Sequence, residues 1–270
     1  MPAWERRYRD RCESYEGDPN AWRAQAPAHA DGLALMEQFS ACSWVVSQGP
    51  DGAISAKLYI RARTDIQLPF EPSVSPRWEI ARCSGDRSEA NEPKLEVSAL
   101  LQTQDGFLVG YDSGEFGGGL SWFNAEGQFQ ESFTNENTWR IVPTSTGAVV
   151  FTGLSHVFSN KGQVLRLRHR AGRWQVARTN LPGAPLAVFP DANESFLVAT
   201  TRHLLRIQRD LRVTVLHRGA WGGNGSLNSM ARDASGTIYL GMGYVVARLR
   251  PTRTGYVEEW LAPVGPQLLR

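Results

Sequence analysis

Residues 226–263 read SLNSMARDASGTIYLGMGYVVARLRPTRTGYVEEWLAP. Asp, Ser and Gly at 233–236 and Pro, Thr and Gly at 251–255 are turn residues. Between them stand runs rich in β-branched and aromatic residues, at 227–232, 237–242, 244–250 and 256–261. Short runs of this kind separated by Asp/Gly turns are typical of hairpins, so the stretch predicts four antiparallel strands.

The same four-strand pattern occurs three more times upstream. The four units begin at Val97, Trp139, Pro185 and Leu227, which is the roughly 40–45-residue period of propeller blades. The upstream strands are predicted at 97–103, 107–112, 120–124, 129–133, 139–143, 148–152, 163–168, 174–177, 186–189, 196–200, 203–208 and 213–216. A fifth, less regular unit covers 42–83, with strands at 42–47, 53–61 and 78–81 and a Pro-rich insertion at 67–76.

These units predict an all-β fold, a β-propeller of about five four-stranded antiparallel blades. Six blades result if residues 33–61 and 66–83 belong to separate blades. We expect residues 1–32 to form an N-terminal extension with a short helix at 3–15, and residues 264–270 to form a tail. The propeller then spans 33–263, with 33–39 as the strand that closes the ring.

Composition excludes several classes of protein. The formal net charge of +2 is too small to indicate binding to nucleic acid or to an anionic membrane. No apolar run is long enough for a transmembrane helix, and the N-terminus is charged where a signal peptide is apolar. We therefore expect a monomeric cytoplasmic protein, or a periplasmic one if a leader was removed. The three cysteines are far apart and predict free thiols.

Residues 229–241, SMARDASGTIYLG, resemble the blade phrase of NHL-type and gluconolactonase-like propellers, including bacterial ones. In the gluconolactonase-like family, a divalent cation on the channel axis is held by Glu, Asn and Asp side chains. The resemblance implies Asn228 as a candidate ligand, with Glu115 and Asp112 beside it, and Ca²⁺ or Mg²⁺ as the ion. The matching positions of the other blades hold no Asn or Asp: they are Ala99, Val142 and Val188. The resemblance therefore supports the fold more than the metal.

Irregular loops are expected at one end of the blades. Residues 113–119 and 154–162 connect second to third strands, and 219–225 connects two blades. Loops on one face of a rigid scaffold are where binding sites usually occur. The predicted binding residues there are Asp112, Glu115, Phe116, Asn135, Glu136, Asn137, His156, Phe158, Asn160, Trp221, Asn224 and Asn228.

Two of these residues have alternative interpretations. The glycines around Glu115 are consistent with a bulged hairpin in which this carboxylate binds its own backbone, or with an acid that faces the channel. His156 is either a hydrogen-bonded loop residue or a catalytic base. A third group, Arg166, Arg168 and Arg170, alternates along a strand, and we interpret it as the solvent face of an outer strand.

No G-x-S-x-G elbow and no phosphate-binding G-x-x-x-x-G-K-[ST] motif occurs. The sequence therefore favours a non-catalytic, cofactor-free propeller that binds another protein, such as an immunity protein that neutralises a toxin or enzyme. The alternative is a metal-dependent lactonase- or lyase-like enzyme, in which Glu115 and His156 would be catalytic and Glu115 and Asn228 would bind the ion.

Overall fold

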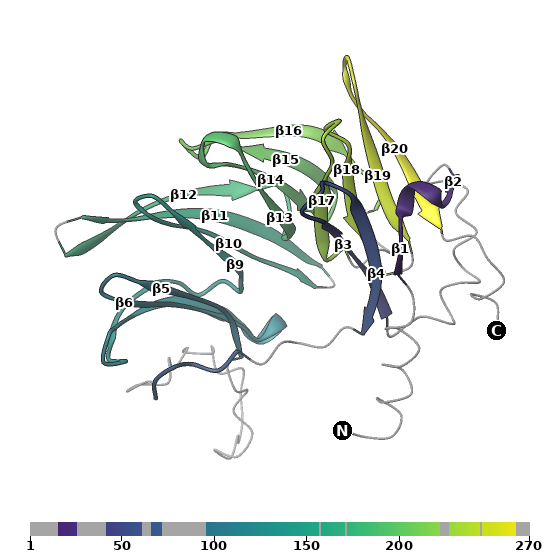
Figure 1. Cartoon of the computed structure of the whole chain (residues 1–270). Coiled ribbons are helices and arrows are strands. Elements are labelled where there is room, and N and C mark those ends of the chain that lie inside the picture. Colours follow the sequence, from purple (N-terminus) through teal and green to yellow (C-terminus); the bar gives the residue numbers. More distant parts are fainter. Residues whose placement is uncertain are drawn as a thin grey trace, which may run out of the picture. The chain divides into compact units, whose positions relative to one another are not determined.

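The computed structural model describes residues 16–25, 42–60, 66–71, 96–156, 158–170, 172–221, 227–243 and 245–262. Within these residues the strands form five sheets, and the helices are single 3-10 turns of three residues (Figure 1). The predicted fold class, an all-β propeller with about five antiparallel blades, is confirmed in its strand content and blade count. No sixth sheet is present among the described residues.

The chain divides into two compact units. The first unit consists of the described residues within Met1–Ala62, Leu186–Gln208 and Val213–Arg270. The second unit takes those of Arg63–Pro185 and Arg209–Arg212.

The second blade, in the second unit, contains four strands in chain order: β5 (Val97–Thr103), β6 (Gly106–Asp112), β7 (Gly118–Asn124) and β8 (Phe129–Thr134). Gly106 closes the first hairpin at φ 148°, where a Cβ atom would collide with the backbone oxygen of Phe123. Only glycine is compatible with this geometry, which explains the Asp-Gly turn seen in the sequence. All four strands lie within two residues of their predicted bounds.

The third blade repeats this order with longer strands: β9 (Thr138–Thr144), β10 (Gly147–His156), β11 (Ser159–Arg170) and β12 (Arg173–Leu181). The loop predicted at 154–162 is wrong, because β10 and β11 pair Leu154 with Lys161 and Ser155 with Asn160. Polar residues in both arms of this hairpin lack the apolar alternation from which a strand is predicted.

The predicted outer position of the arginine strand is also wrong. β11 lies between β10 and β12, and Arg166 is only 3% exposed. The alternation of Arg166 and Arg168 was correctly read as one face, but that face is not the edge of a sheet.

The second and third blades share one hydrophobic core. Leu108 and Leu120 of the second blade pack with Val150, Leu165 and Leu167 of the third blade, and all five side chains are fully buried. Burying such aliphatic side chains stabilises a fold by about 1.5–3 kcal/mol each. This core fixes the two blades of the second unit against each other.

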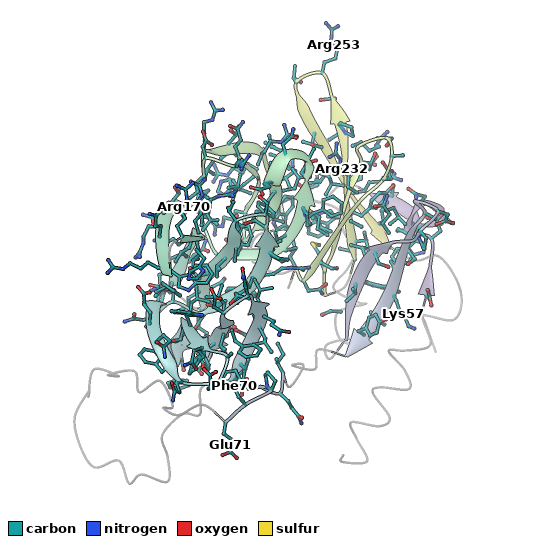
Figure 2. All side chains as sticks on the ribbon, turned by 60° about the vertical axis from the view of Figure 1, so that its left-hand side comes forward. Lys57, Phe70, Glu71, Arg170, Arg232 and Arg253 are labelled. Carbon is teal, nitrogen blue, oxygen red and sulfur yellow. The ribbon has the colours of Figure 1, made fainter. Side chains whose placement is uncertain are left out.

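The opposite face of the second blade is covered by residues 66–71. The ring of Phe70 lies 5.0 Å from that of Phe107 and 5.3 Å from that of Phe123. Figure 2 shows Phe70 against the strands, with Glu71 pointing away from them. This described part of the Pro-rich insertion therefore packs on the blade.

The first unit contains three blades. The fourth blade is β13 (Pro185–Asp191), β14 (Ser195–Thr200), β15 (His203–Ile207) and β16 (Val213–Arg218), with η5 (Ala192–Glu194) between its first two strands. The fifth blade is β17 (Ser229–Arg232), β18 (Ile238–Gly241), β19 (Val246–Thr252), β20 (Gly255–Ala262) and β2 (Arg23–Gln25). The first blade is β3 (Cys42–Gln48), β4 (Ile54–Ile60) and β1 (Glu16–Gly17).

Two cores connect these three blades. Leu197 and Leu204 of the fourth blade pack with Ile238 and Leu240 of the fifth. On the other side of the fifth blade, Tyr239 packs with residues of the first blade, among them Trp44 and Leu58. The fifth blade is thus buried on both faces, as the near-continuous apolar runs in its sequence indicate.

The N-terminal residues 16–25 join the first and fifth blades. β1 pairs with β4, and β2 pairs with β20. Between these strands, η1 (Pro19–Ala21) places Asn20, whose Oδ1 accepts a 2.6 Å hydrogen bond from the Tyr239 hydroxyl. Trp22 packs edge-on against Trp44. This segment was predicted only as part of an extension, and it supplies strands to two sheets.

Several predicted elements lie outside the described residues: the helix at 3–15, the closing strand at 33–39, the strand at 78–81 and the C-terminal tail. In the part of the chain that the structure describes, no helix is long and apolar enough to span a membrane.

Candidate functional site

Three segments of the second unit contact one another. They are η4 (Gly114–Phe116), the connection 135–137 and the tip of the β10–β11 hairpin. They are linked by the contacts described below. We call this region the hairpin-tip surface, and it comprises Asp112, Glu115, Phe116, Asn135, Glu136, Asn137, His156, Phe158 and Lys161.

Hydrogen bonds from neighbouring polar groups hold η4 in place. An Asp112 carboxylate oxygen accepts the backbone N–H of Gly114 at 2.8 Å, which stabilises the start of the turn. Asn137, only 3% exposed, donates from Nδ2 to the Gly114 carbonyl oxygen at 2.7 Å. The backbone N–H of Gly118 donates to the carbonyl oxygen of Asn135. The side chains of Asp112 and Asn137 therefore position the loop, whereas Asn135 does so through its backbone carbonyl and keeps an exposed side chain.

Two charged pairs connect the segments. Glu115 Oε2 lies 3.1 Å from His156 Nδ1, and Glu136 Oε1 lies 2.7 Å from Lys161 Nζ. Both side chains of the first pair are about half exposed, at 51% and 49%. Because they are exposed, these charges are accessible to another molecule. Exposed pairs also contribute little to the stability of the fold.

Aromatic side chains project from the same segments. Phe116, next to Glu115, is 51% exposed, and Phe158, two residues after His156, is completely exposed. Trp139 of β9 is 38% exposed, and its Nε1 donates to the Gly153 carbonyl oxygen. Exposed large apolar residues among charged groups are typical of interaction surfaces.

Two further predicted site residues belong to the first unit, and a third lies outside the described residues. Trp221 belongs to the first unit, is 1% exposed and donates from Nε1 to the Thr200 carbonyl oxygen, so it is a core residue. Asn228 is exposed and also belongs to the first unit. Asn224 lies outside the described residues. Asn160, by contrast, is on the hairpin, where its Oδ1 accepts the Ala184 N–H.

The described residues do not fit the divalent cation that the family resemblance implies. Among them, no group of three or more His, Cys, Asp or Glu side chains could hold a metal ion. The Glu115 carboxylate is paired with His156.

Sequence reasoning missed Lys161 as a member of the hairpin-tip surface and missed the exposure of Trp139. Lys161 falls within the stretch wrongly predicted as a loop, and Trp139 was assigned only to a strand. Extending the β10–β11 register beyond Gly162 would have placed Lys161 at the hairpin end.

Comparison with known proteins finds no family and no curated protein that matches this sequence. Among solved structures, a catalytically inactive virginiamycin B lyase from Staphylococcus aureus with quinupristin has a TM-score of 0.43 and 11% identity. The match covers 66% of this chain and 59% of the lyase. A protein of unknown function from Bacteroides caccae has a TM-score of 0.39 and 14% identity, over 62% of this chain and 61% of that one. The chain thus spans less than two thirds of both proteins, and we draw no functional argument from similarity at this level.

Proposed function

We propose that this protein is a non-catalytic binding protein that captures another protein through its hairpin-tip surface. The observation that carries the proposal is the exposure of Phe116, which follows Glu115, and of Phe158, two residues after His156, in segments joined by the Glu115–His156 pair. Phenylalanine rings of this size bury much apolar area when they insert into a partner, and they contribute strongly to binding.

The scaffold supports this role. The hairpin-tip surface is carried by two blades that share a fully buried core, and η4 is fixed by the Asp112 and Asn137 hydrogen bonds. A preorganised surface loses little conformational entropy on binding. A stable inhibitor of a toxin or enzyme needs such rigidity, so we propose an immunity-type or inhibitor partner relationship.

The charged residues of the hairpin-tip surface indicate which charges the partner should carry. Glu115, Glu136, His156 and Lys161 place both signs beside the aromatic rings. The partner should therefore have an apolar pocket surrounded by charged groups of both signs, which orient the complex more than they strengthen it.

The test is affinity capture from the native cells, compared between variants and quantified by mass spectrometry. The double variant Phe116→Ser/Phe158→Ser should lose the captured partner, while Tyr59→Ser should keep it. Tyr59 is a matched control because it is an aromatic residue, 41% exposed, in the other unit. Far-ultraviolet circular dichroism checks that each variant is folded. Equal capture by the double variant and the control would contradict the proposal.

The same aromatic residues could instead form the contact between two copies of this chain. Sedimentation of the purified protein distinguishes the two. A dimer that dissociates in the double variant would assign the surface to a second copy of the chain rather than to a different protein.

The alternative function is an enzyme of the lactonase or lyase type, and the Glu115–His156 pair is the observation that favours it, since such a pair can transfer protons. In that case Ca²⁺ or Mg²⁺ should raise the unfolding temperature, and Glu115→Gln should abolish the increase. No change on adding either ion would argue against a bound metal.

A further inference from the structure

A second candidate site lies in the second unit and shares no residue with the hairpin-tip surface. A pocket of about 380 Å³ is lined by Arg166, Arg168, Gln175, Val176, Ala177, Arg209, Asp210 and Leu211. Small-molecule pockets in proteins usually have volumes of about 300–1,000 Å³. The pocket is therefore large enough for a compact ligand.

The strand register explains why polar groups line it. Arg166 pairs with Ala177, and Arg168 pairs with Gln175, across β11 and β12. Paired and alternate residues share one face of a sheet. The intervening Leu165 and Leu167 enter the core shared by the second and third blades. One face of the β11–β12 hairpin is thus apolar core, and the other presents two arginines and a glutamine.

The charge of the lining is strongly positive. It contains three arginines and one aspartate. Asp210 is partly used by its own turn, because its Oδ1 accepts the backbone N–H of Arg212 at 3.1 Å. The lining therefore has a formal excess of two positive charges.

The burial of Arg166 strengthens this inference. The residue is 3% exposed, so the packing around it limits the conformations of its long side chain. Arg166 and Arg209 also interact with other groups of the protein. Such interactions restrict the side chains, which lowers the entropy lost when a ligand binds.

We propose that this pocket binds a small molecule carrying at least two negative charges on phosphate or carboxylate groups. Guanidinium groups donate two parallel hydrogen bonds to either kind of oxyanion, and Gln175 offers a further amide donor. Ala177 and Leu211 provide an apolar wall for a short carbon segment of the ligand. The site is independent of the proposed protein-binding function.

Isothermal titration calorimetry of the full chain in a low-chloride buffer tests this proposal, with inorganic pyrophosphate and citrate as separate probes. Saturable one-site binding of either probe supports the site. Binding of pyrophosphate alone assigns phosphate chemistry, and binding of citrate alone assigns carboxylate chemistry. Failure of both probes to bind at millimolar concentration overturns the proposal.

Three variants localise the binding. Arg168→Gln and Arg209→Gln each remove one charged donor and should weaken binding about tenfold or more. Asp210→Asn should instead tighten it, because the repulsive charge is removed while the Oδ1 acceptor for Arg212 remains.

The matched control is Arg170→Gln, which removes the same charge from the same strand, at an exposed position that does not line the pocket. Arg170 is labelled in Figure 2 and lies at the end of β11 that leads into β12. Binding should be unchanged in this variant. Equal weakening by Arg170→Gln and Arg168→Gln would show that the anions respond only to overall charge, and would overturn the proposal.

Discussion

Glu115 Oε2 lies 3.1 Å from Nδ1 of His156, and this pair connects the η4 turn to the end of the β10–β11 hairpin. The two residues are 41 positions apart in the sequence and come from neighbouring blades. Two residues that were weak candidates separately thus form part of one surface.

Removing the charge of this pair should affect recognition more than stability. Glu115→Gln should change the free energy of unfolding by less than about 0.5 kcal/mol, because exposed ion pairs contribute little. Urea unfolding followed by tryptophan fluorescence measures this. A loss of several kcal/mol would mean that Glu115 is a structural residue.

Asn137 should behave in the opposite way. Asn137→Ala removes the donor to the Gly114 carbonyl from a side chain that is 3% exposed. We expect a loss of about 1–2 kcal/mol in urea unfolding and weaker partner capture, because η4 is no longer held. Full stability in this variant would contradict the positioning role.

Trp221 should be essential for folding and not directly for binding. Trp221→Ala leaves a large cavity in the core shared by the fourth and fifth blades and should cost about 3–5 kcal/mol. Trp221→Phe keeps most of the volume, loses only the hydrogen bond to Thr200, and should cost about 1–2 kcal/mol. Partner capture by the folded Phe variant should equal that of the unaltered protein, and selective loss of capture would contradict this assignment.

The free energy of unfolding should decrease in acid because Glu258 becomes protonated there. Burial raises the pKa of Glu258, but hydrogen bonds from His217, the Ala220 backbone and Trp260 outweigh it, so the pKa lies below the ordinary value of 4.5. A lowered folded-state pKa stabilises the fold above pH 4.5, and this contribution disappears as the pH falls through the folded-state pKa.

The expected result is a urea midpoint that falls below about pH 4.5 in the unaltered protein and falls less in Glu258→Gln. Glu131→Gln is the control, because Glu131 is exposed on β8. The same acid dependence in all three proteins would rule out Glu258 as the cause.

The N-terminal segment should stabilise the first unit. Deleting residues 1–25 removes β1 and β2 and exposes the edges of β4 and β20. Exposed edges promote association between chains, so the deleted protein should unfold at a lower temperature and aggregate. A smaller change, Tyr239→Phe, removes only the hydrogen bond to Asn20 and should cost about 1 kcal/mol. Unchanged melting after the deletion would contradict this role.

The strands of the second to fifth blades could be predicted because turn residues such as Gly106 and Gly236 separate them at regular intervals. The extension of β10 to His156 could not, since residues 153–156 (Gly, Leu, Ser and His) include a single apolar residue and therefore no apolar alternation. The N-terminal strands could not be predicted either, because β1 and β2 contain only two and three residues. Such short strands give no periodic signal and depend on the edges of β4 and β20.

The candidate site was predicted in part. Glu115, Phe116, His156 and Phe158 were identified because propeller topology places second-to-third connections at the same end of neighbouring blades. Trp221 was misjudged because a tryptophan in a glycine-rich connection looks exposed in a sequence, whereas the indole is buried and hydrogen-bonded to Thr200. Burial of a loop residue depends on tertiary packing, which local composition does not encode.

Site-specific photo-crosslinking in the native cells tests whether the hairpin-tip surface contacts another protein. A photoreactive amino acid replaces Phe158 in one variant and Tyr59, in the other unit, in a second. The proposed surface predicts a single heteromeric adduct from position 158 and none from position 59, and it predicts that Phe116→Ser weakens this adduct. An adduct from position 59 with none from position 158 would contradict it.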